Sequence, residues 1–106
     1  MKKTVGEMLP IVEYLCSLSD KEVTLYLRSV KTKVVQFLCD FLLNVEGGQI
    51  FISVNVVDEL RPSKMLILSL IKVKKSLKAR REELTKKGVF HKIFCPLLPV
   101  LRSLAK

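Results

Sequence analysis

The chain has 106 residues, of which 49% are hydrophobic, and it carries a formal net charge of +9. This length allows one domain with a single modest core, and the apolar content excludes a chain that stays disordered. So strong a basic balance predicts attraction to a polyanion, which could be nucleic acid, an acidic membrane face or an acidic protein, and charge alone does not separate these partners.

The charge is unevenly distributed along the chain. Residues 1–71 carry eight Lys or Arg residues and eight Asp or Glu residues, whereas residues 72–106 carry eleven against two. The second part therefore supplies the whole net charge. We expect a single helical domain over 1–106, with 1–71 as a charge-neutral core part and 72–106 as a basic and C-terminal part.

The first half of the chain has the apolar spacing of helices. Hydrophobic residues recur every three or four positions across residues 5–18, which predicts a first helix. Ser19 and Glu22 match a capping box, so a second helix should begin near Asp20. The same spacing continues to Glu46 with a break around 29–33, and the glycine pair that follows is expected to end this helix.

The middle of the chain is expected to bend. Residues 50–52 are β-branched and aromatic, and we interpret them as a buried extended connector. Ser53 or Asn55 can cap the helix that follows, and Pro62 predicts a bend within it. Residues 65–73 are apolar nearly all round, which indicates deep burial or an oligomer contact.

The basic segment over 72–88 is predicted to be a helix docked on the domain. Ser76 can cap its start and Gly88 can stop it, while Leu77 and Leu84 lie seven residues apart and form a thin apolar seam. Cations beside this seam are expected to form a stripe that faces solvent, composed of Lys74, Lys78 and Arg81.

The cations of this segment are the leading candidates for a functional site. Clustered cations that neutralise phosphates release counterions, which gives affinity without sequence recognition. The predicted nucleic-acid-binding residues are Lys72, Lys74, Lys75, Lys78, Arg80, Arg81, Lys86 and Lys87. A solvated helix face with Lys78–Glu82 and Glu83–Lys87 pairs is the plainer alternative, but two carboxylates cannot neutralise so many cations.

The C-terminal segment is apolar and contains Pro96 and Pro99. We expect a helical hairpin or two short helices that meet at these prolines. Closing the core is the favoured role, because a small domain needs this apolar area. The alternative is contact with a membrane or a partner, which would involve Phe90, Ile93, Phe94, Leu97, Leu98 and Leu101.

Catalysis, metals and cofactors have little support in the sequence. His91 is the only histidine, and no glycine-rich phosphate loop occurs. Cys16, Cys39 and Cys95 are far apart without metal-ligand spacing, so we expect free thiols in a reducing compartment. We predict no enzyme, no catalytic residues, no metal and no cofactor. No signal segment or transmembrane stretch is indicated, which predicts an intracellular protein that is not secreted.

Three stretches between Phe37 and Leu104 carry a resemblance to a known family: 44–50 (NVEGGQI), 76–88 (SLKARREELTKKG) and 96–101 (PLLPVL). They resemble a small basic protein of Maverick/Polinton-type DNA transposons and adintovirus-like elements. The resemblance implies a viral or transposon origin, a nuclear or virion location, and a DNA genome as partner.

Taken together, the sequence predicts an all-α bundle of four to six helices that includes a basic helix. Its expected function is sequence-independent binding or compaction of DNA, most naturally double-stranded, by a viral or transposon accessory protein. A membrane-active or capsid-associated helical protein, and a helical interaction module that forms homo-oligomers, remain as alternatives.

Overall fold

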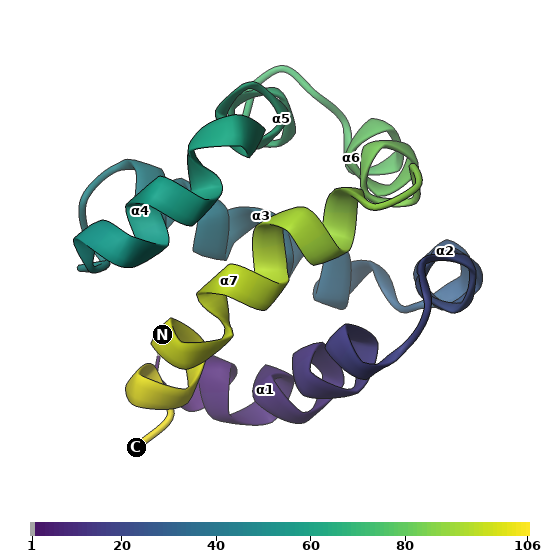
Figure 1. Cartoon of the computed structure of the whole chain (residues 1–106). Coiled ribbons are helices and arrows are strands. Elements are labelled where there is room, and N and C mark those ends of the chain that lie inside the picture. Colours follow the sequence, from purple (N-terminus) through teal and green to yellow (C-terminus); the bar gives the residue numbers. More distant parts are fainter. Residues whose placement is uncertain (1) are drawn as a thin grey trace.

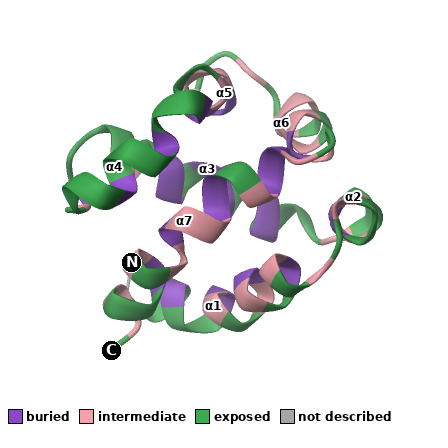
Figure 2. Cartoon of the chain, in the orientation of Figure 1, coloured by how far each residue is buried: buried purple, intermediate pink, exposed green. Residues whose placement is uncertain are grey.

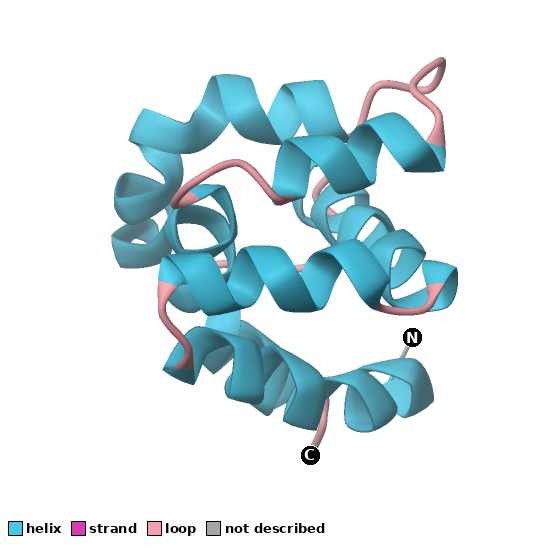
Figure 3. Ribbon diagram, turned by 90° about the vertical axis from the view of Figure 1, so that its right-hand side faces the viewer, coloured by secondary structure: helices cyan, strands magenta, loops and turns pink. Residues whose placement is uncertain are grey.

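In the computed structural model, which describes residues 2–106, every regular element is helical (Figures 1 and 3). The elements in order are α1 Lys2–Ser17, α2 Asp20–Ser29, α3 Thr32–Glu46, α4 Val54–Leu60, the 3-10 turn η1 Arg61–Ser63, α5 Lys64–Leu70, α6 Leu77–Leu84 and α7 Val89–Leu104. The all-α prediction is confirmed. Because α4, η1 and α5 follow one another without a loop, the described chain has six continuous helical segments, the upper end of the predicted number.

The core forms around α7. This helix crosses the middle of the molecule in Figure 1 and packs against α1, α2, α4 and α6. Its inward face is fully buried. Helix α3 also contributes many buried residues to the core, as its purple segments in Figure 2 show. The C-terminal segment therefore closes the core, as the favoured interpretation of the sequence predicted. The fully buried side chains of α7 include Phe90, Ile93, Phe94, Leu97 and Leu101.

The prediction that Pro96 and Pro99 divide the C-terminal segment was wrong, because α7 is one helix of 16 residues with both prolines inside. A proline in a helix interior costs about 3 kcal/mol through its missing amide and its clash with the preceding turn. Continuity places Ile93, Leu97 and Leu101 on one face at spacings of four, all completely buried. The two prolines together cost about 6 kcal/mol, and burial of these three side chains, at about 1.5–3 kcal/mol each, offsets that cost.

The boundary between α1 and α2 was predicted correctly from local chemistry. The Glu22 amide donates to Ser19 Oγ at 3.2 Å, and the Ser19 amide donates to Glu22 Oε1 at 3.1 Å. These bonds form the expected capping box and hold the pKa of the Glu22 carboxyl below its ordinary value. The box contributes fully above the ordinary pKa of a glutamate and weakens as the pH falls through the lowered one.

The segment between α3 and α5 matches the prediction only in part. Ser53 caps α4 through the Val56 amide, at 3.4 Å, and the bend expected at Pro62 occurs as η1. The connector was expected to be buried, and Ile50 is, but Phe51 is 89% exposed. The prediction that residues 65–73 are deeply buried was also wrong at both ends, because the side chains of Met65 and Val73 lie in solvent.

Candidate nucleic-acid interface

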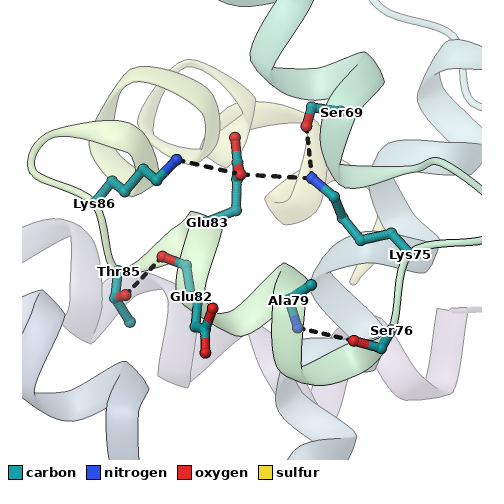
Figure 4. Close-up of polar contacts among 8 residues, drawn as sticks. All are labelled: Ser69, Lys75, Ser76, Ala79, Glu82, Glu83, Thr85 and Lys86. Carbon is teal, nitrogen blue, oxygen red and sulfur yellow. Dashed lines mark hydrogen bonds and ion pairs between the residues drawn. The ribbon is translucent and has the colours of Figure 1, made fainter.

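The basic helix α6 is fixed to the domain by an apolar seam and a serine cap. Leu84 is buried and Leu77 packs against the core from its edge. Ser76 Oγ accepts from the Ala79 amide at 3.1 Å (Figure 4), which confirms the predicted cap. The helix is therefore a rigid support for the charges that surround it.

The predicted end of the basic helix was wrong. It ends at Leu84 instead of continuing to Gly88, and Gly88 is the residue that precedes α7, with φ of +78°. The Thr24 hydroxyl of α2 donates to the Thr85 carbonyl at 2.8 Å, and Thr85 Oγ1 turns back to the Glu82 carbonyl at 2.8 Å. These contacts hold the chain in a turn just after α6.

Arg81 does not belong to a solvent-facing stripe. Its Nη1 donates to the Leu27 carbonyl at 2.6 Å and to the Val30 carbonyl at 2.7 Å, so the guanidinium lies over the C-terminal end of α2. A helix end leaves carbonyls without intrahelical partners and carries partial negative charge. The part-buried Arg81 thus joins α6 to α2, and the prediction of a free cation was wrong at this position.

Lys75 is also held by neighbouring side chains. Its Nζ donates to Ser69 Oγ at 2.6 Å and lies 3.5 Å from Glu83 Oε2, and only 19% of the lysine side chain is exposed (Figure 4). Lys86 approaches the same carboxylate at 3.6 Å but stays mostly in solvent. Glu83 thereby pairs with Lys75 and Lys86, whereas the plainer alternative drawn from the sequence paired it with Lys87.

Arg80 ties the start of α6 to the turn before it. Its Nη2 donates to the Lys72 carbonyl at 2.7 Å, while Nε is buried without a hydrogen-bond partner. The guanidinium is therefore buried at Nε and committed at Nη2 to the backbone of the preceding turn. Arg80, like Lys75 and Arg81, organises the local structure.

The remaining predicted cations are exposed on both sides of α6. Lys92, near the start of α7, is exposed as well. We call this set the lysine surface, and it consists of Lys72, Lys74, Lys78, Lys86, Lys87 and Lys92. Its members come from the turn before α6, the helix itself, the turn after it and the first turn of α7. The structure therefore separates five of the eight predicted cations, which are available to a ligand, from three that are structural.

Helix α2 extends this surface with cations that sequence analysis missed. It packs beside α6 on the right of Figure 1, the side that faces the viewer in Figure 3. A shallow depression of about 490 Å³ lies between them and brings Lys21 and Arg28 to the same place as Lys87. Asp20, also at this depression, lies with its Oδ1 2.7 Å from His91 Nδ1, and its carboxylate accepts a hydrogen bond from the imidazole. Pairing of α2 with α6 joins residues about 60 positions apart, which no local pattern reveals.

The alternative membrane or partner surface on the C-terminal segment is not supported. Five of its six proposed residues are fully buried on α7, and Leu98 is half-buried against the core. None of the described helices is long and apolar enough to cross a membrane. Within residues 2–106, no group of three or more His, Cys, Asp or Glu side chains is placed to hold a metal ion.

Comparison of the chain with protein-family models, with curated proteins and with solved structures finds no match.

Proposed function

We propose that the protein binds duplex nucleic acid without sequence preference, with DNA as the expected ligand, as a small viral or transposon accessory protein. The observation that carries this proposal is the lysine surface: six exposed ammonium groups around one rigid helix, with only Glu82 and Glu83 as acidic residues in the segment 72–92. Glu83 is already paired with Lys75 and Lys86. The other lysines keep their charge for phosphates, which supply affinity through counterion release.

The arrangement favours phosphate contact over base recognition. The exposed members around α6 are lysines, which act as flexible point charges, whereas its two arginines, Arg80 and Arg81, are held by backbone carbonyls, and Arg28 on α2 is the exposed arginine beside this surface. Aromatic side chains that could stack on unpaired bases are absent from the exposed part of 72–92. We therefore expect binding that depends on salt and tolerates any duplex sequence.

The test is a titration of a short DNA duplex across a salt series. Replacing Lys72, Lys74 and Lys78 with Gln should weaken binding at least tenfold at low salt and reduce the log–log salt slope by up to about 3, since each phosphate contact contributes about 0.9. The matched control removes the same charge from elsewhere, at Lys33, Lys64 and Lys106, which are exposed and do not line the depression between α2 and α6. Equal loss of affinity in both triple variants would refute a localised surface.

We also propose self-association as a second function, which one observation favours. Phe51 protrudes from the α3–α4 connection, and the next residue, Ile52, lines an apolar groove of about 320 Å³ between α3, α4 and α5. If the ring of one copy enters the groove of a second copy, two-fold symmetry lets the second copy make the same contact in return. Sedimentation at increasing concentration tests this proposal.

A further inference from the structure

Two cysteines that are 79 positions apart in the sequence meet where α1 packs on α7. The side chains of Cys16 and Cys95 lie close enough to interact, and the neighbouring Cys95 contributes to the raised pKa of Cys16. These helices make the most extensive contact between any two elements of the described chain, and they run side by side in Figure 1. The two cysteines are therefore neighbours on two helices that pack directly on each other.

The surroundings keep the pair at the edge of the core. Both cysteines are half-buried, whereas Cys39 is completely enclosed on α3. About two turns from Cys95, Arg102 of α7 binds Glu13 of α1, which lies one turn from Cys16, with Arg102 Nη2 and Nε 2.9 and 3.0 Å from the carboxylate. This ion pair fixes the register of the two helices, so the thiols stay opposite each other and remain within reach of a small reagent.

We propose that Cys16 and Cys95 are a redox site that forms a reversible disulfide between α1 and α7. The expectation of three unrelated free thiols is thereby replaced by one reactive pair and one inert thiol. The inference is independent of nucleic-acid binding, because neither residue belongs to the lysine surface.

The oxidant is a small-molecule disulfide such as oxidised glutathione. The thiolate of one cysteine attacks a sulfur of the glutathione disulfide, which forms a mixed disulfide and releases one glutathione thiolate. The second cysteine then loses its proton and displaces the other glutathione. In total, two protein thiols and one glutathione disulfide give one protein disulfide and two molecules of reduced glutathione.

The reaction should be slow at neutral pH and faster in alkali. Burial, followed by the interactions with Cys95, raises the pKa of Cys16 to about 12, while Arg102 opposes the rise and Glu13 adds to it. Only the thiolate attacks a disulfide, so a protonated thiol reacts slowly. Burial also raises the pKa of Cys39 to about 11, and its enclosure keeps the oxidant away.

The experiment incubates the folded, full-length chain with oxidised glutathione at pH 8.5, quenches with acid, unfolds the protein and alkylates the remaining thiols. Alkylation should fall from three thiols to one, and mass spectrometry of a proteolytic digest should find the Cys16 and Cys95 peptides linked. Three alkylated thiols, a glutathione adduct that does not resolve, or a link that involves Cys39 would overturn the proposal.

Variants sharpen the result. Cys39→Ser should form the same link, whereas Cys16→Ser and Cys95→Ser should each stop at a mixed disulfide. For the wild type, oxidation should raise the Tm by roughly 10 °C or more, because the bond closes a loop over most of the chain. An unchanged or lower Tm after complete oxidation would show that the helices must shift to form the bond, contrary to the proposal.

Discussion

At the scale of single residues, Arg81 illustrates how one cation can be removed from a surface and used for structure. Its guanidinium donates two short hydrogen bonds to the last carbonyls of α2, at 2.6 and 2.7 Å. Without it, these part-buried carbonyls would have to find water at the junction of two helices. Hydrogen bonds from a charged donor contribute about 1.5–3 kcal/mol in such positions, toward the lower value where solvent reaches them.

We predict that Arg81→Ala lowers the free energy of unfolding by about 2–3 kcal/mol and the Tm by roughly 10 °C. Arg81→Lys should cost about half as much, because one ammonium can reach one carbonyl well but cannot span both. Lys78→Ala is the control: it removes one cation from the exposed side of the same helix and should stay within about 0.5 kcal/mol of the wild type. Thermal unfolding followed by circular dichroism checks this, and a similar Tm for Arg81→Ala and Lys78→Ala would contradict it.

Residue identity alone could not separate these two cations. Lys78 and Arg81 lie three positions apart on one helix, and the sequence correctly placed both beside the Leu77 and Leu84 seam. What decides their roles is the end of α2, more than 50 residues earlier in the chain. Periodicity predicts which face of α6 is buried, but it does not predict which element comes to lie along the edge of that face.

At the scale of elements, two glycines occupy helical positions with opposite requirements. Gly88 has a positive φ of 78° at the start of α7, a conformation that side chains with a Cβ adopt at a cost of about 1–2 kcal/mol. Gly6 lies inside α1, and a Cβ built there would meet no atom within 4 Å. The first glycine is needed for its backbone, whereas the second only adds entropy to the unfolded chain.

We therefore predict that alanine has opposite effects at these two sites. Gly88→Ala should lower the free energy of unfolding by about 1–2 kcal/mol through backbone strain alone, since the new methyl group would have ordinary contact distances of 3.7 Å and more. Gly6→Ala should raise it by about 0.5–1 kcal/mol through helix propensity. Urea unfolding curves measure both, and changes of the same sign would show that the assigned conformation at one site is wrong.

At this scale, the sequence predicts a structural feature correctly when the residues that interact lie close together in the chain, and it fails when they lie far apart. Ser19, Ser53 and Ser76 each cap a helix through an amide three residues away, so the sequence contains both partners. The prolines of α7 were misinterpreted because their local preference was overridden by burial against α1, which no local pattern contains. The prediction that Phe51 is buried was wrong for a related reason. An apolar residue in a connector is buried only if another element of the fold covers it, and the local sequence does not show whether one does.

At the scale of the whole molecule, the lysine surface and the apolar groove between α3, α4 and α5 lie on different sides. The lysine surface surrounds α6 and continues onto α2, on the right of Figure 1, whereas α4 and the connection before it lie on the left. The groove next to Phe51 has Glu46 together with Arg61 and Lys64 at its edge, a nearly balanced set. Two copies could therefore meet through the apolar side without bringing their lysine surfaces together.

We expect a weak symmetric dimer in which Phe51 of each copy enters the groove of the other. The groove is lined by apolar side chains that include Leu42, Val57 and Ile67, and its volume of about 320 Å³ falls in the range of small-ligand pockets. A stable dimer buries about 800 Å² on each partner, and a protruding ring with a few aliphatic neighbours gives less, so association should require tens of micromolar protein or more.

The dimer can be tested without disturbing the fold, because Phe51 is 89% exposed and contributes little to the core. In sedimentation velocity, the wild type should sediment faster as concentration rises, and Phe51→Ser should remain a monomer with an unchanged Tm. Leu25→Ser is the matched control, since Leu25 is 57% exposed but lies on α2, away from the groove.

The dimer would also present two lysine surfaces to one duplex, so Phe51→Ser should weaken binding to long DNA more than binding to a duplex that fits one copy. A wild type that remains monomeric at millimolar concentration, or a Leu25→Ser variant with the same defect, would exclude this mode of association.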